Sequence, residues 1–289
     1  MALTINTNLG SLIVQKNLES ATKALNKSIE RMTTGYKINT AGDDAAGYAV
    51  ATKMDTQLSS ISVAQDNVAM GASLLSTAES NYDLIATHLQ RIRDLTEEAA
   101  NGTYGADSIN AIKAEIEARW AEIDRIAATT EFNGIKLMDG ATGTGKPATS
   151  GVNLQIGIDS SANSTLNLEA GLFGKADGAT LLNVAKATFT AYYVAGGTSY
   201  DDALDAIDGA LTEVTQRQTK IGAYQNRLDS AADALEVQYA NVTSSLSTIK
   251  DADVASESSE YIKAQILQQA SATLLSTANQ TPSIALNLI

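Results

Sequence analysis

Residues 207–249 read IDGALTEVTQRQTKIGAYQNRLDSAADALEVQYANVTSSLSTI, and this stretch decides the fold. Thirteen of its positions follow an unbroken 4-3 spacing, and only two of the thirteen are not apolar. They are Ile207, Leu211, Val214, Gln218, Ile221, Gln225, Leu228, Ala232, Leu235, Tyr239, Val242, Leu246 and Ile249. A seam that repeats every 3.5 residues occupies one side of an α-helix and requires a partner helix along its length. We therefore predict one helix over residues 200–249, about 75 Å long at 1.5 Å per residue.

Two further apolar seams lie in the first half of the chain and supply the partner helices. The longer seam consists of Ile61, Ala64, Val68, Gly71, Leu75, Ala78, Tyr82, Ile85, Leu89 and Ile92. The shorter seam consists of Ile109, Ile112, Ile116, Trp120, Ile123 and Ile126. The first proline is Pro147, so no proline interrupts the backbone hydrogen bonds of these helices. The pattern predicts a mainly α protein built on a long antiparallel coiled-coil rod, closed by helices that are distant in sequence.

The two ends of the chain carry a separate pattern. Residues 4–33 and 254–281 each place apolar side chains on one helical face, and we expect Pro282 to end the second helix. The side chains that we assign to an assembly interface are Leu18, Leu25, Ile29, Met32, Ile262, Ile266, Leu267, Ala270 and Leu274. Neither segment alone can bury enough surface to offset the entropy of ordering its backbone. We expect the N- and C-terminal segments to pair with each other and with neighbouring copies of the chain.

A small β-hairpin region is expected between the helices. Residues 132–135 contain the turn dipeptide Asn133-Gly134, and residues 152–158 alternate between apolar and polar side chains as a half-buried strand does. The predicted divisions are 1–42 and 251–289 for the paired ends, 43–140 for the N-terminal rod helices and the start of the β region, 141–198 for a β-hairpin and variable region, and 199–250 for the C-terminal rod helix.

Composition excludes several classes of protein. The formal net charge of −13 disfavours nucleic acid and anionic membrane surfaces, both of which require a basic patch. The chain has no cysteine, and its only histidine is His88, so thiolate metal sites, His-Glu-x-x-His sites and histidine-based triads are excluded. We expect His88 to be solvated. The N-terminal MALTINTNLG has no secretory leader pattern, and no stretch has the length of a transmembrane helix. We therefore predict neither an enzyme nor a cofactor-binding or membrane-inserted protein.

Residues 140–146, GATGTGK, fit the spacing of a phosphate-binding loop. That motif requires Ser or Thr at the next position, and Pro147 stands there instead. We favour a hairpin loop over a nucleotide site.

Several stretches resemble the signatures of bacterial flagellin. They are SIERMTTG at 28–35, IN at 38–39, DDAAG at 43–47, GAYQNRL at 222–228, AQILQQA at 264–270 and ANQ at 278–280. The resemblance covers about residues 1–140 and 200–289 in the family's order. Tyr36 departs from it, because the family more often has Leu there, and Gly42 stands where a larger residue is common.

The resemblance implies a near-minimal subunit of the flagellar filament. By that resemblance, residues 1–42 and 251–289 form the inner coiled-coil domain of the filament, and the three rod helices form the next shell. It also implies export unfolded through the flagellar type III apparatus, an export chaperone, contact with the filament cap and hook-associated proteins, and a secreted, extracellular location in a helical homopolymer.

One surface stretch resembles a receptor-binding segment of the family. Residues 90–95 read QRIRDL and resemble the flagellin stretch that Toll-like receptor 5 recognises. Gln90, Arg91, Arg93 and Leu95 are the matching residues there, and Glu115 matches another contact position. The alternative interpretation is an ordinary solvated arginine face, with Leu95 at the edge of the seam.

Three rival functions remain open on the sequence. A hook–filament junction protein shares the design of the end segments and differs in copy number. A secreted enzyme on the same frame is disfavoured by the single histidine and the absence of cysteine. A soluble immune ligand or adhesin would not polymerise, so electron micrographs distinguish it from a filament subunit.

Overall fold

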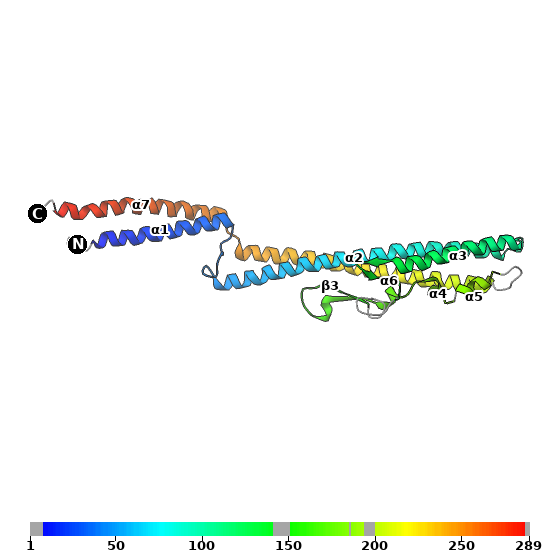
Figure 1. The fold of residues 1–289 in the computed structure, drawn as a ribbon. Helices are drawn as coiled ribbons and strands as arrows, with labels where there is room; N and C mark the ends of the chain where they lie inside the picture. The colour runs from blue at the N-terminus through cyan, green and yellow to red at the C-terminus, as the bar shows by residue number, and fades with distance from the viewer. Residues whose placement is uncertain (1–7, 141–150, 185, 194–199, 287–289) are drawn as a thin grey trace. The chain divides into compact units, whose positions relative to one another are not determined.

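The computed structural model describes residues 8–140, 151–184, 186–193 and 200–286 of the 289-residue chain. The chain divides into two compact units. We call Met1–Ser59 with Ala240–Ile289 the terminal unit, and Ser60–Tyr239 the central unit. Long helices dominate both units, and two small antiparallel sheets lie in the central unit (Figure 1). The predicted fold class, with long paired helices and a small β region, is confirmed.

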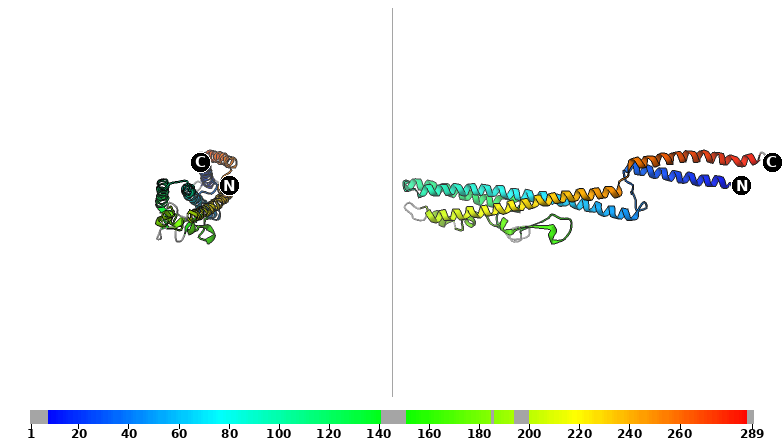
Figure 2. Two further views of the ribbon diagram at one scale, coloured as in Figure 1. Left: turned by 90° about the vertical axis from the view of Figure 1, so that its right-hand side faces the viewer. Right: turned by 180° about the vertical axis from the view of Figure 1, so that it is seen from behind.

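In the terminal unit, α1 (Leu9–Thr34) and α7 (Val254–Leu286) lie side by side with their directions reversed (Figures 1 and 2). The residues buried between them are small: Ala21 and Ser28 on α1, and Ala264 and Ser271 on α7. On each helix the two residues are seven positions apart, which is the period of a coiled-coil seam. The ends of the chain therefore pair as predicted, but through a narrow seam of small side chains.

The two connectors of the terminal unit, residues 35–44 between α1 and α2 and residues 251–253 between α6 and α7, pair with each other. Gly35 ends α1 in the left-handed conformation with φ 75°, which a residue without a Cβ adopts at no steric cost. Its carbonyl accepts a hydrogen bond from the Ala252 amide (2.8 Å), and the Lys37 amide donates to the Lys250 carbonyl (2.8 Å). Asp44 then accepts bonds from the amides of Ala46 and Gly47, as expected of the residue that caps the next helix.

The prediction that Pro282 ends the last helix is wrong, because α7 continues through Pro282 to Leu286. Proline has a helical φ but no N–H, so it cannot bond the carbonyl four residues earlier, which is that of Ala278. The Asn8 side-chain amide donates to the Ala278 carbonyl at 2.8 Å. The partner helix thus supplies a hydrogen bond where the proline supplies none.

The central unit is built on α3 (Ala106–Thr129) and on the larger parts of α2 (Ala45–Ala100) and α6 (Tyr200–Lys250), which contribute the predicted seams. All sixteen seam positions predicted in the first half of the chain are buried, including the core residues Ile61, Val68, Leu75, Leu89 and Ile92. On α6, Ile207, Ile221, Leu228 and Leu235 are buried as predicted. These residues form the core of the central unit, in which Trp120 and Tyr82 are the largest fully buried side chains.

The second track of the α6 seam differs from the prediction. Leu211 is only half-buried, and Tyr239 is exposed, whereas Ala210, Arg217 and Tyr224 are buried. The two glutamines of the predicted seam lie at its edge and bond carboxylates of α2: Gln218 donates to Asp83, and Gln225 donates to Glu79. The buried face of α6 is shifted because a further layer of chain covers the Ala210 and Arg217 side.

That layer consists of residues 151–184 and 186–193, and it contains the second of two small sheets. Strands β1 (Glu131–Phe132) and β2 (Ile135–Lys136) form the predicted two-residue hairpin at Asn133-Gly134. Strand β3 (Val152–Gln155) pairs with β4 (Thr165–Leu168), so the strand predicted over 152–158 ends three residues early. The covering segments that follow are η2 (Ala170–Phe173), α4 (Gly178–Leu181) and α5 (Lys186–Ala191), and η1 (Ala162–Ser164) precedes β4.

Arg217 holds the covering layer to the helices. Its Nη1 donates to the carbonyls of Gly174 (3.1 Å) and Lys175 (3.4 Å) and to the Tyr82 hydroxyl (3.2 Å). The Tyr82 hydroxyl donates in turn to the Leu172 carbonyl at 2.8 Å. One buried cation thus connects α6, α2 and the segment after β4.

Candidate assembly surface and receptor site

Large apolar side chains lie on the outside of the α1–α7 pair. Leu274 and Ile266 are more than half exposed, at 57% and 59%. Among the residues that the structure describes, the full set is Leu9, Leu12, Ile13, Ile29 and Met32 on α1, with Val254, Ile262, Ile266, Leu267 and Leu274 on α7. Ala270, another residue that we assigned to the interface, is also exposed, whereas Leu18 and Leu25 are half-buried. An exposed apolar surface of this extent is typical of an interaction site.

Polar contacts fix the register of the α1–α7 pair. Asn8 caps α1 by accepting the Ser11 amide (3.0 Å), while its Nδ2 bonds α7. Ser11 bonds Asn279 at 2.7 Å, and Gln268 donates to the Thr22 hydroxyl at 3.2 Å. The pairing therefore uses mainly small and polar groups, and it leaves most of the large apolar groups exposed.

Lys250 ties the two connectors of the terminal unit to α2. Its Nζ lies 3.0 Å from Asp55 Oδ2 and 4.6 Å from the centre of the Tyr36 ring. The hydrogen bond to Asp55 raises the pKa of Lys250, so the ammonium remains charged. Tyr36 is the residue that departs from the family pattern, and the sequence alone gave no reason for that departure.

Two of the predicted receptor residues, Arg91 on α2 and Glu115 on α3, are in contact. Arg91 is exposed, and its Nε donates to Glu115 Oε1 at 3.1 Å. This hydrogen bond lowers the pKa of Glu115 and raises that of Arg91. Gln90 is exposed as well, and Arg93 bridges Asp208 (2.7 Å) and Glu97 (2.6 Å). Four of the five predicted residues are therefore accessible, but Arg93 pairs with Asp208 on α6, whereas Arg91 pairs with Glu115 on α3.

Leu95 does not belong to that surface. Its side chain is 2% exposed, so it packs in the core instead of facing a partner. The next residue, Thr96, is also buried, and its hydroxyl lies 2.6 Å from the Tyr193 hydroxyl. Helical spacing places Arg91 and Leu95 one turn apart, but it does not reveal that the segment around Tyr193 covers this part of α2.

His88 is half-buried, which corrects the expectation of a solvated side chain. Its Nδ1 is buried and has no hydrogen-bond partner within the described residues. Burial lowers the pKa of His88; Arg119 and Arg125 on α3 lower it further, and Glu122 opposes them. The imidazole is therefore held in its neutral form near pH 7.

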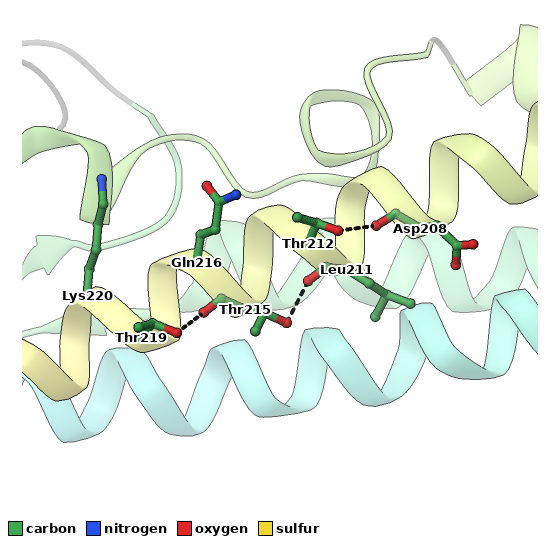
Figure 3. Close-up of a pocket in the computed structure, with 7 residues that line it drawn as sticks. All are labelled: Asp208, Leu211, Thr212, Thr215, Gln216, Thr219 and Lys220. Carbon is green, nitrogen blue, oxygen red and sulfur yellow. Dashed lines mark hydrogen bonds between the residues drawn. The ribbon is translucent and has the colours of Figure 1, made fainter.

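A shallow hollow of about 730 Å³ follows the outer face of α6. Figure 3 shows Thr212, Thr215 and Thr219 with their hydroxyls turned back to helix carbonyls, each bond being 2.8 Å long. Asp208 and Lys220, which also line the hollow, pair with Arg93 and Glu169. Because these groups are already bonded within the chain, they offer little to a ligand.

No metal-binding or membrane-spanning feature occurs in the part of the chain that the structure describes. Within residues 8–140, 151–184, 186–193 and 200–286, acidic side chains and His88 form no group that would hold a metal ion. Among the same residues, no helix combines the length and hydropathy needed to cross a bilayer. The phosphate-loop pattern at 140–146 lies almost wholly outside the described residues.

Comparison with known proteins identifies the family. The model for the bacterial flagellin N-terminal helical region matches residues 5–142, and the model for the C-terminal helical region matches residues 204–289. The chain is 38% identical to flagellin of Bacillus subtilis (strain 168) and 34% identical to flagellin of Listeria monocytogenes, in each case over 99% of both chains.

A solved structure assigned as a flagellar hook-associated protein of Vibrio parahaemolyticus has the same fold. It matches with a TM-score of 0.60 and 18% identity, covering 72% of this chain and all of that one. Fold, exposed helix pair and matched relatives together define a helical structural protein of bacterial flagella. The chain belongs to the bacterial flagellin family, and the resemblance inferred from its motifs is confirmed.

Proposed function

We propose that this chain is a structural subunit that self-assembles into the bacterial flagellar filament. The observation that carries the proposal is the arrangement of α1 and α7, which have small residues between them and, among the described residues, ten large apolar side chains outside. Burying ten side chains that are each about half exposed would contribute on the order of 10 kcal/mol per subunit. Copies of the same chain that pack around the helix pair provide that burial.

The proposal predicts that apolar-to-polar changes on α7 prevent polymerisation. Ile266→Ser with Leu274→Ser removes two of the most exposed apolar groups from the helix. Gln269→Ser is the matched control, because it places the same residue at an exposed polar position of the same helix. Seeded polymerisation followed by electron microscopy should give filaments from the control and none from the double variant. Deleting residues 262–289 should likewise leave soluble subunits, and normal filaments from that truncation would refute the mechanism.

The partners that family membership supports are part of the same proposal. They are an export chaperone, the filament cap and hook-associated proteins, met during export of the unfolded chain to an extracellular filament. A chain whose end segments gain most of their burial from neighbouring subunits is well suited to export before folding. Pull-down of the full chain before export, with and without residues 262–289, tests whether the chaperone binds the segment whose apolar face is exposed.

A second proposed activity is recognition of the free subunit by Toll-like receptor 5. The supporting observation is that Arg91 on α2 and Glu115 on α3 form an accessible ion pair, with Gln90 exposed beside Arg91, while Arg93 pairs with Asp208 on α6. Arg91→Ala with Glu115→Ala should abolish signalling in a receptor reporter assay. Arg125→Ala with Glu122→Ala is the control, because it removes an equivalent exposed ion pair of α3. Equal signalling by both double variants would reject the receptor site.

A hook–filament junction protein remains the rival proposal. The fold does not distinguish the two, since the hook-associated neighbour shares it. The copy number per isolated flagellum does, because a filament contains thousands of subunits and a junction contains few.

A further inference from the structure

The chain contains two Asn-Gly dipeptides in different structural settings. Asn101-Gly102 lies in the turn between α2 and α3, and Asn133-Gly134 lies in the hairpin between β1 and β2. Asparagine followed by glycine is the dipeptide most prone to loss of the side-chain amide, because glycine has no Cβ to obstruct attack by its own nitrogen. The same reactive chemistry is therefore present twice in one molecule.

The reaction requires only water and a base from the solvent. The glycine amide loses its proton, and its nitrogen forms a bond to the asparagine Cγ. The Cγ–Nδ2 bond then breaks, and the nitrogen leaves as ammonia. Water opens the resulting five-membered imide at either carbonyl, which gives aspartate or isoaspartate. The slow step is reached only when backbone rotation brings the amide nitrogen to Cγ.

The turn at Asn101 permits that rotation. Asn101 and Gly102 are exposed, and a Cβ at Gly102 would have no atom within 4 Å. The turn is held by two long backbone bonds, from the Asn101 amide to the Glu98 carbonyl (3.2 Å) and from the Tyr104 amide to the Asn101 carbonyl (3.3 Å). Among the described residues, none accepts a hydrogen bond from the Gly102 amide.

One contact at Asn101 also favours the chemistry. The Thr103 amide donates to Asn101 Oδ1 at 3.3 Å. Negative charge develops on this oxygen when nitrogen attacks Cγ, and a positioned N–H stabilises such charge. The turn therefore combines a free nucleophile with a donor to the oxygen of the attacked amide.

The hairpin at Asn133 opposes the same step. Asn133 and Gly134 have φ values of 49° and 78°, and the strand pairs Phe132↔Ile135 and Glu131↔Lys136 fix both sides of the turn. The Leu137 amide continues this pairing to the Thr130 carbonyl at 3.1 Å, and Leu137 is fully buried. Rotation at Asn133 requires this paired, anchored hairpin to open.

We propose that Asn101 is a site of spontaneous covalent modification in the folded chain, where attack by the Gly102 nitrogen converts it to aspartate and isoaspartate while Asn133 is protected. The product adds a negative charge just beyond the C-terminal end of α2, where the helix dipole disfavours it. Glu97 and Glu98 already lie in the last turn of that helix. Modification therefore weakens the end of α2 and marks the age of a subunit.

Incubation of the full-length chain in mildly alkaline buffer, followed by tryptic peptide mapping, tests the proposal. Cleavage after lysine and arginine separates residues 94–113, which contain Asn101, from residues 126–136, which contain Asn133. Asn101 should convert about thirtyfold faster than Asn133, equivalent to about 2 kcal/mol in activation free energy. Gly102→Ala, which the open turn accommodates, should slow conversion at Asn101 and leave Asn133 unchanged.

The urea-unfolded chain is the control for intrinsic chemistry. Both dipeptides should convert at equal rates there, because neither turn persists. Equal rates in the folded chain, or faster conversion at Asn133, would overturn the proposal. A ratio that stays the same in urea would also overturn it, because sequence rather than fold would then set the difference.

Discussion

Arg217 offers the sharpest test of how the covering layer is attached to the helices. Three acceptors from two other segments surround its Nη1, and Nε bonds Glu213 at 2.9 Å. Arg217→Ala leaves the Gly174 and Lys175 carbonyls without this donor. Breaking one side of a buried charged network costs about 3–5 kcal/mol, so we expect the free energy of unfolding to fall by about 4 kcal/mol.

Two companion variants separate charge from geometry. Arg217→Lys keeps the charge but loses the planar fork that reaches several acceptors, so the loss should be about half as large, roughly 2 kcal/mol. Glu213→Ala removes the outer partner, whose side chain is 47% exposed, and should cost less than about 1 kcal/mol. The free energy of unfolding should therefore fall most for Arg217→Ala, less for Arg217→Lys and least for Glu213→Ala.

Trp120 provides the assay, because it is the only tryptophan and is 1% exposed. Its ring lies 5.0 Å from that of Phe189, which belongs to the covering layer. Urea titration followed by tryptophan fluorescence thus reports on the central unit. A loss for Arg217→Ala no larger than that for Glu213→Ala would refute the attachment role.

Three further predictions follow from named contacts. Burial lowers the pKa of His88 below its ordinary 6.5, so the unfolded chain binds a proton that the folded chain does not as the pH falls through that value. The urea midpoint measured by Trp120 fluorescence should therefore drop with falling pH, and His88→Gln should make the midpoint depend less on pH. Gly71→Ala would place a Cβ against Leu154 and lower the free energy of unfolding by about 2 kcal/mol, whereas Gly222→Ala, in open space on α6, should raise it by about 1 kcal/mol. Equal effects of the two variants in urea titration would contradict the contact between Gly71 and Leu154. Lys250→Met removes the ion pair with Asp55 and the contact with the Tyr36 ring, so hydrogen exchange at the Ala252 and Lys37 amides should be about tenfold faster by mass spectrometry. Unchanged exchange would show that the pairing of the connectors does not depend on Lys250.

Helical periodicity predicted the long helices and most of the buried positions of α2 and α3, because the spacing of apolar residues is a direct consequence of helix geometry. It placed Leu211 in the core and Ala210 outside, since both lie near the same edge of the helix and leucine is the larger apolar residue. The structure reverses this assignment because residues 151–193, which have little periodicity, cover the Ala210 side. A third layer of irregular chain cannot be found from the pattern of the helices that it covers.

Contacts from distant segments also explain why the predictions for Leu95 and for the end of α7 were wrong. The sequence identified Arg91 and Glu115 correctly as accessible, because charged residues opposite a seam face solvent. It misplaced Leu95, whose burial depends on contacts from a distant segment. It ended α7 at Pro282, because the rule for proline concerns one helix, whereas the donor to Ala278 comes from Asn8 on another.

In the terminal unit the small side chains are buried and most of the large apolar ones are exposed, and this arrangement connects folding to assembly. A helix pair that is stable by itself buries its largest side chains between the helices, whereas this pair buries Ala21, Ser28, Ala264 and Ser271. Small side chains contribute little apolar area, so the pair gains little from its own contact relative to the entropy lost in ordering two long helices. Leu18 and Leu25 are only half-buried, and most of the other large apolar residues point outward, where another molecule can bury them. In the proposed filament, ordering of the ends and addition of a subunit are therefore one thermodynamic step, and a change such as Ile266→Ser weakens both together.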